Sequence, residues 1–240
     1  MRDYRSFAAR LSGAELTVLY ACGRPVSYQR GDQLMRQGER GECVIVVRSG
    51  LVKVTRTDDT GSIRLLGVRG PGELLGEMSC LDEQPRSASV VAHNEVYGVR
   101  IAGKEFLDYL YQHPRAAREV TCQMASRLRA AERHQEAMAA GGVDGRVLWI
   151  LSDMSELFAP NGARTAEIPL HQHELAQLIA TALISVQRSL RVLRTNRLVT
   201  TRRGRIVVPC VRCLRRAAVV RETGTEAINR RCADPDCCSG

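Results

Sequence analysis

The sequence predicts an α+β protein in which an antiparallel, jelly-roll-like β-roll precedes a long helix and a smaller helical domain. Short apolar segments separated by glycine fill residues 26–100, which is typical of such a roll. A stretch free of glycine and proline then covers residues 115–140. Two helical patterns and a basic hairpin follow, up to residue 208. The 240 residues suffice for one large domain or two small ones.

Residues 1–112 are predicted to form the β-roll, with a short helix over 104–111 at its end. The apolar run Cys43–Val47, the alternating segment Leu51–Thr55 and the segment Ile63–Val68 each have the pattern of a strand. Glycines recur every few residues here, so each strand is expected to be short. Many short strands with frequent turns favour an antiparallel roll.

Residues 113–140 are predicted to form one amphipathic helix of about 27 residues, or roughly 40 Å. Pro114 suits the first helical position because its missing N–H would have no partner there. A helix of this length with a narrow apolar stripe favours pairing with a second copy in a two-fold homodimer. Packing along its own domain is the alternative. The stripe, at spacings of three and four, consists of Ala117, Val120, Met124, Leu128, Ala131, Gln135 and Met138.

Residues 141–209 are predicted to form the smaller domain. Two glycines end the long helix, and Asp144 is expected to cap a helix that continues to Phe158. Residues 159–166 read as a loop. The next elements are a helix over 171–180, a tight turn, a helix over 183–196, and strands at 198–201 and 205–208 around Arg202-Arg203-Gly204. This order is the pattern of a winged helix-turn-helix.

The distribution of charge indicates that this domain binds a polyanion. The chain has a net charge of +9, and the segment from Leu175 to Arg221 holds eleven arginines and no acidic residue. A solvated basic face is the alternative, but in a winged helix-turn-helix the second helix meets base edges and the wing meets phosphates. Double-stranded DNA is therefore the predicted partner. The candidate DNA contacts are Ser185, Gln187, Arg188 and Arg191 on the second helix and Arg202 and Arg203 in the wing.

Composition and motifs argue against a membrane protein and against an enzyme. No apolar run approaches the roughly 18 residues that a membrane helix needs, and no apolar segment of a secretory signal follows Met1. A cytosolic protein is therefore expected. The sequence contains no P-loop motif and no nucleophile–base constellation of the kind that enzymes use. Its five histidines form no catalytic signature.

A further motif lies within the predicted β-roll. Residues Gly72–Met78, followed by Pro85–Ser89, resemble the phosphate-binding cassette of cyclic-nucleotide-binding domains. Together with the helix-turn-helix, they make residues 20–209 similar to the cyclic-AMP receptor protein/FNR family of bacterial transcription regulators. The resemblance implies a homodimer whose β-roll is the sensor domain and whose effector is cyclic AMP or a related cyclic nucleotide. It also implies RNA polymerase as a partner.

The resemblance assigns four ligand contacts, namely Gly76, Glu77, Arg86 and Ser87. The chemistry suits these residue types, because a guanidinium can meet a cyclic phosphodiester and a carboxylate can accept a hydrogen bond from a ribose hydroxyl. A glycine lets backbone amides approach closely. The alternative is that Glu77 and Arg86 form an ion pair in a roll that binds nothing.

The sequence departs from the family pattern at two places. Ala131 and Glu132 stand where the family binds the adenine with a Thr-Ser pair. Glu132 is therefore a candidate base contact, and cyclic GMP or loss of response are alternatives to cyclic AMP. In the second helix, Leu183 and Ile184 replace the usual Arg and Glu readers, while Arg188 matches a family reader. Leucine and isoleucine can touch a thymine methyl but cannot read guanine or cytosine, so a different operator is expected.

The nine cysteines fall into two groups. Cys22, Cys43, Cys80 and Cys122 are scattered and are expected to be small buried residues. The other five lie in a predicted tail over residues 210–240, where Ala217–Arg221 and Thr225–Asn229 are expected to form a hairpin around Glu222-Thr223-Gly224. Structural zinc, a thiol redox switch and the absence of any site are the three alternatives. Control of DNA binding by this tail, without a nucleotide, is the alternative function. The candidate zinc ligands are Cys210, Cys213, Cys232 and Cys237.

Overall fold

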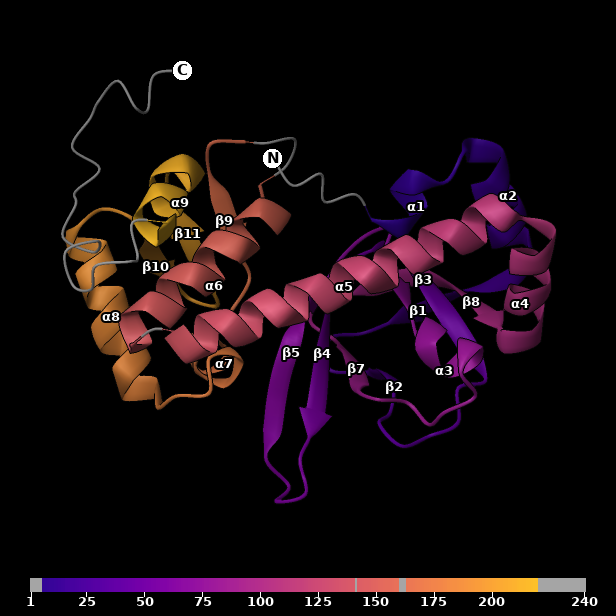
Figure 1. The fold of residues 1–240 in the computed structure, drawn as a ribbon, viewed down its shortest axis with the longest axis horizontal. Helices are drawn as coiled ribbons and strands as arrows, with labels where there is room; N and C mark the ends of the chain where they lie inside the picture. Colours follow the sequence, from indigo (N-terminus) through magenta and orange to yellow (C-terminus); the bar gives the residue numbers. More distant parts are fainter. Residues whose placement is uncertain (1–5, 141, 160–162, 220–240) are drawn as a thin grey trace. The chain divides into compact units, whose positions relative to one another are not determined.

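The computed structural model describes residues 6–140, 142–159 and 163–219. The chain forms two compact units, Met1–Ala130 and Ala131–Gly240 (Figure 1). Within the described part of the chain, none of the helices combines the length and the apolarity required to cross a bilayer.

The first unit is built on two four-stranded antiparallel sheets, which confirms the predicted β-roll. In the first sheet β8 and β3 are the central strands, and in the second β7 and β4 are central; Figure 1 shows the β4–β5 hairpin reaching beyond the rest of the roll. In spatial order the sheets are β1 (Gly23–Tyr28), β8 (Val96–Ala102), β3 (Cys43–Ser49) and β6 (Leu74–Leu75), and β2 (Gln33–Met35), β7 (Ser89–Ala92), β4 (Val52–Thr57) and β5 (Ile63–Arg69).

Strand β3 explains why one segment of the sequence is continuously apolar. Val44 and Val46 join a core that includes residues of the helices, such as Phe106. Ile45 and Val47 point to the opposite face and join a second core with residues of β4 and β7. Successive side chains of a strand alternate between its two faces, so a strand covered on both faces needs apolar residues throughout.

Helices cover the outer face of the first sheet. Helix α2 begins with a capping box in which Ser12 and Glu15 satisfy each other's backbone N–H groups. The Tyr109 hydroxyl donates to the Glu15 carbonyl at 3.0 Å, and burial together with the Glu15 charge raises the pKa of Tyr109 to about 12. The sequence analysis did not predict α1 or α2. The helices of this unit are α1 (Phe7–Arg10), α2 (Gly13–Ala21), α3 (Glu77–Leu81), α4 (Gly103–Gln112) and the first part of α5 (Pro114–Ala140).

Helix α5 has the bounds that the sequence predicts, and it contains 27 residues. Val120 is buried in the core of the β-roll, and Ala137 is buried within the second unit. Between them Leu128 is 63% exposed and Ala131 is also exposed. One section of the apolar stripe is therefore uncovered in a single chain.

The second unit contains the predicted helices and wing, with three corrections. Gly142, not Asp144, is the N-cap of α6, and Asp144 lies in the first turn. Residue 166, expected in a loop, begins a strand, β9, which pairs with β11. A helix, α9, follows the wing. The elements are α6 (Val143–Leu157), β9 (Ala166–Ile168), α7 (Gln172–Leu178), α8 (Leu183–Thr195), β10 (Thr200–Arg202), β11 (Arg205–Val208) and α9 (Val211–Val219).

Helix α9 contradicts the predicted start of the tail. A strand of the expected hairpin was to begin at Ala217, but Ala217 is helical and buried. Leu214 is fully buried one turn earlier, and α9 packs against α6. Apolar residues three apart give α9 one buried face, whereas Arg212 and Arg215 are exposed. The residues up to at least Ala217 therefore belong to the folded second unit. The rest of the expected hairpin lies outside the described residues.

Candidate nucleotide site and DNA-binding face

The cassette of the β-roll is built around a left-handed glycine. Gly76 has a φ of 79°, and a Cβ at this position would lie 2.3 Å from Nη1 of Arg86. Arg86 is only 6% exposed, and its Nη1 donates to the Gly76 carbonyl at 2.6 Å. Its Nη2 donates to the Cys43 carbonyl at 2.5 Å. Both terminal nitrogens of the guanidinium are thus held by backbone oxygens, which fixes this cation beside Gly76.

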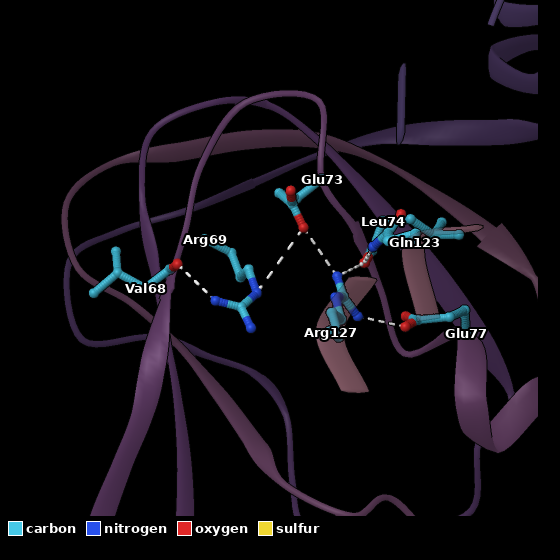
Figure 2. A network of polar contacts seen from close by, with 7 residues as sticks. All are labelled: Val68, Arg69, Glu73, Leu74, Glu77, Gln123 and Arg127. Atoms are coloured by element: carbon cyan, nitrogen blue, oxygen red, sulfur yellow. Dashed lines mark hydrogen bonds and ion pairs between the residues drawn. The ribbon is translucent and has the colours of Figure 1, made fainter. Parts of the chain in front are cut away.

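Glu77 follows Gly76 as the first residue of α3, and its side chain is 2% exposed. Its partner is Arg127 of helix α5, whose Nη1 donates to Oε1 of Glu77 (Figure 2). The alternative pairing, between Glu77 and Arg86, is not found among the ion pairs of the described residues. Glu77 therefore links the cassette to helix α5.

Arg127 also binds a second buried carboxylate. Its Nη2 lies 2.9 Å from Oε2 of Glu73 and 2.8 Å from the Leu74 carbonyl. Glu73 is 4% exposed and has Arg69 as a further cation, at 3.9 Å (Figure 2). Two buried carboxylates within the cassette are thus paired with arginines from β5 and α5, because an unpaired buried charge would be costly.

Sequence analysis missed Arg127 and Glu73. Glu73 lies within the quoted cassette segment but was given no role, and Arg127 is one of several arginines on α5. The position of Arg127 along α5 could have identified it. It lies three residues after Met124 and seven after Val120, and both of these pack against the core of the roll. An arginine on the core-facing side of a helix requires a carboxylate partner.

The other two predicted ligand contacts, Ser87 and Glu132, have exposed side chains. Ser87 is exposed, directly after Arg86. Glu132 is exposed on α5 and belongs to the second unit, whereas the cassette belongs to the first. The structure thus brings Gly76 and Arg86 into contact with each other, and Glu77 directly follows Gly76 in the chain. It gives neither Ser87 nor Glu132 a described hydrogen bond to them.

The second unit holds helices α7 and α8 in a fixed pair. Leu175 and Ile179 from the α7 side and Val186, Leu190 and Leu193 from α8 are almost fully buried. Ala180, with a φ of 48°, takes a left-handed conformation at the turn. The Thr181 N–H donates to the Ala176 carbonyl at 3.0 Å, which closes the end of α7.

The opposite face of α8 and the wing are exposed and cationic. Gln187, Arg188 and Arg191 are exposed on α8, and Ser185 is half-buried. Arg202 ends β10 and Arg203 lies in the turn before β11; both are exposed. These six predicted DNA contacts therefore belong to one domain, and five of them are open to solvent.

Two interactions brace the wing. Nη1 of Arg194 on α8 donates to the Thr201 hydroxyl of β10 at 3.3 Å. Arg205 of β11 pairs with Glu167 of β9 at 2.7 Å. The strand β9 thus ties the wing to the chain that enters α7, and it holds Arg202 and Arg203 at one end of a three-stranded sheet.

The cysteines are placed as follows. Cys43 and Cys80 are buried as expected, but Cys22 and Cys122 are only half-buried. Cys210 is buried immediately before α9, and its sulfur accepts the Cys213 N–H at 3.4 Å. Cys232 and Cys237 lie outside the described residues. Within the described ranges, no group of three or more histidine, cysteine or acidic side chains could hold a metal ion.

Comparison with known protein families gives two matches. Residues 25–113 match the model of the cyclic nucleotide-binding domain, and residues 145–217 match the model of the Crp-like helix-turn-helix domain. The second match includes most of α9, in agreement with the packing of that helix on α6.

Individual proteins are similar over most of the chain. The cyclic AMP receptor protein of Thermus thermophilus is 33% identical over 193 residues, which cover 79% of this chain and 82% of the relative. The CRP-like cAMP-activated global transcriptional regulator of Mycobacterium tuberculosis is 28% identical over 195 residues, covering 79% and 87%. A solved structure of the c-di-GMP-responsive global regulator CLP of Xanthomonas campestris superposes with a TM-score of 0.69 at 22% identity, covering 82% of this chain and 99% of that chain.

Proposed function

Because the chain belongs to the CRP/FNR family of transcription regulators, we propose that it is a homodimer gated by a cyclic nucleotide in its β-roll. Like these relatives, it is a DNA-binding transcription regulator and not an enzyme. The finer proposal names cyclic AMP as the effector, RNA polymerase as a partner, and Gly76, Glu77, Arg86 and Ser87 as the ligand contacts.

One observation carries the nucleotide site. The Arg86 guanidinium is held against Gly76, and the Glu77 carboxylate follows directly in the chain. A cyclic nucleotide presents one negative phosphodiester and one ribose hydroxyl, which match a cation and a hydrogen-bond acceptor. Since Glu77 already binds Arg127, a ribose hydroxyl would share or replace that interaction. Ligand binding would thereby act on helix α5.

Cyclic AMP is the favoured effector because two relatives with 28–33% identity carry cyclic AMP in their names. The regulator that responds to c-di-GMP is 22% identical, and this likeness supports the fold alone. Glu132 stays a proposed base contact, with its carboxylate as an acceptor for a base amino group. The homodimer is supported by the uncovered section of the α5 stripe, where Leu128 is 63% exposed.

The nucleotide proposal is tested by calorimetric titration with cyclic AMP, cyclic GMP and c-di-GMP. We expect micromolar binding of cyclic AMP and its loss in Arg86→Gln, with the dimer retained by size-exclusion chromatography with light scattering. Arg64→Gln is the matched control, because Arg64 is exposed on β5 and pairs with Asp58. Absence of heat and of any thermal shift with all three nucleotides would contradict the proposal.

The alternative function is regulation of DNA binding by metal or thiol chemistry. It is favoured by the pair of Cys210 and Cys213 at the start of α9. A cytosolic pair at this spacing more often binds metal than forms a disulfide, and zinc is the proposed metal. Measuring the zinc content of the protein, and DNA binding with and without a chelator or an oxidant, tests it. A cyclic-nucleotide response in a protein without metal would rule this alternative out.

A further inference from the structure

The first turn of helix α8 carries two exposed apolar side chains. Leu183 is 41% exposed and Ile184 is 65% exposed, although Val186, Leu190 and Leu193 of the same helix are almost fully buried. Leu183 lies on the same side of the helix as these buried residues but stays partly open, whereas Ile184 lies on the opposite side and does not contribute to the buried face.

Ile184 lies on the face of α8 that is directed to solvent. Residues 184, 188 and 191 follow the spacing i, i+4, i+7, so their side chains project within a sector of about 60°. Arg188 and Arg191 are exposed, as Ile184 is. An apolar side chain is therefore aligned with two cations on the face proposed to bind DNA.

The start of α8 lacks the features that usually stabilise a helix end. The N-cap, Ala182, makes no side-chain hydrogen bond, and the first turn contains no acidic residue. Serine, threonine or aspartate at the N-cap and acidic residues in the first turn are favoured there. An exposed isoleucine at the second helical position adds no helix propensity over a polar residue. Binding to DNA would explain this first turn of α8. Acidic residues there would repel the DNA phosphates, whereas exposed apolar side chains could contact apolar groups of the bases.

The partner follows from the chemistry of the major groove. The first residues of a recognition helix meet base edges, and the thymine 5-methyl is the apolar group exposed there. A protein partner would fit poorly, because the segment from Leu175 to Arg221 has eleven arginines and no acidic residue. We propose that Ile184, assisted by Leu183, recognises thymine through its 5-methyl group, while Gln187 and Arg188 supply the hydrogen bonds to neighbouring bases. The inference rests on the proposed DNA contacts and adds a base preference to them.

The experiment uses the full-length protein, with and without cyclic AMP, and a library of DNA duplexes with a randomised central segment. Sites are selected from the library, and each thymine of a recovered half-site is then replaced singly by deoxyuridine, which removes only the methyl group. Dissociation constants are measured by fluorescence anisotropy at one fixed salt concentration. We expect about fourfold weaker binding when the contacted thymine is replaced, the value for roughly one buried methyl group.

Two variants make the assignment specific. In Ile184→Ala the thymine and deoxyuridine duplexes should bind equally, and Ile184→Val should restore part of the difference. Arg191→Ala, on the same face, should weaken both duplexes by the same factor. Circular dichroism verifies the fold, which exposed substitutions should leave intact.

Each result decides the matter. Selected duplexes that bind equally well with thymine or deoxyuridine at every position would overturn the methyl contact and leave DNA binding intact. A methyl effect that persists in Ile184→Ala would assign the contact to another residue and also overturn the proposal. If no sequence is enriched under either condition, sequence-specific DNA binding by this domain fails, and the inference fails with it.

Discussion

The buried ion pairs of Arg127 provide a quantitative test of how the cassette is held to α5. The substitution Arg127→Met keeps the length and the apolar stem of the side chain but removes its charge. Glu77 and Glu73, whose side chains are 2% and 5% exposed, then lose this cation, and Glu73 keeps its pair with Arg69, at 3.9 Å. Breaking a fully buried pair costs about 3–5 kcal/mol.

The expected cost for Arg127→Met is about 2–3 kcal/mol, below the full range, because the Arg127 side chain is 28% exposed. For a unit of this size, that loss corresponds to a fall of about 8–12 °C in Tm. Differential scanning calorimetry measures it, since this method separates the transitions of the two units. Arg64→Met is the control: its pair with Asp58 is exposed, at 3.5 Å, so the Tm should barely change.

A second variant tests the mechanism. Adding Glu77→Gln to Arg127→Met removes the buried Glu77 charge that has lost its arginine, so the double variant should melt at a higher temperature than Arg127→Met. The reasoning is refuted if Arg127→Met melts no lower than Arg64→Met. It is also refuted if Glu77→Gln lowers the Tm further in the Arg127→Met background.

Three further predictions concern the cassette, the second unit and the wing. Gly76→Ala should abolish the heat of nucleotide binding measured by calorimetry, because the added Cβ would lie 2.3 Å from Nη1 of Arg86. Gly61→Ala is the control: the φ of Gly61 is similar, no atom lies within 4 Å of the added Cβ, and the nucleotide should bind normally. Burial beside Trp149 lowers the pKa of His134 below its ordinary value of 6.5, against the opposing charge of Asp153. Its unfolded form therefore binds protons more readily. The second unit should lose stability as the pH falls through the unfolded value of 6.5, and this slope should weaken in His134→Gln when melting is followed by Trp149 fluorescence. Arg202→Ala and Arg203→Ala should each reduce the slope of log K against log salt for DNA binding by about 0.9, and an unchanged slope would mean that the wing does not contact phosphates.

Long periodic segments were predictable from the sequence because their signal is local. The bounds of α5 agree at both ends, since Pro114 begins it and a pair of glycines follows Ala140. The strands β3, β4 and β5 and the helices α7 and α8 were also predicted from apolar spacing and turn residues. For these elements local patterning was sufficient, because their apolar spacing and flanking turn residues lie within the element itself.

Elements that depend on distant partners were missed. Strand β9 has three residues, too few for a period, and exists because it pairs with β11 about forty positions later. Arg127 is defined by Glu77, fifty residues earlier, and no spacing along α5 separates it from the neighbouring arginines. In α9, the apolar spacing of Leu214 and Ala217 predicts a helix, but it overlaps the Cys210 and Cys213 pair, whose spacing is also typical of a metal site.

The two carbonyls that hold Arg86 have a consequence for the energetics of the proposed effector site. A free arginine side chain loses about 2 kcal/mol of rotamer entropy when it is fixed in one geometry. Here the backbone oxygens of Gly76 and Cys43 fix it as the β-roll folds. An arriving phosphate would therefore not bear that entropic cost, so the site is preorganised for its ligand. Affinity for the effector then depends also on the backbone of Cys43, which is not among the proposed ligand contacts. Changes around Cys43, inside the β-roll, can therefore tune the response without altering any contact residue.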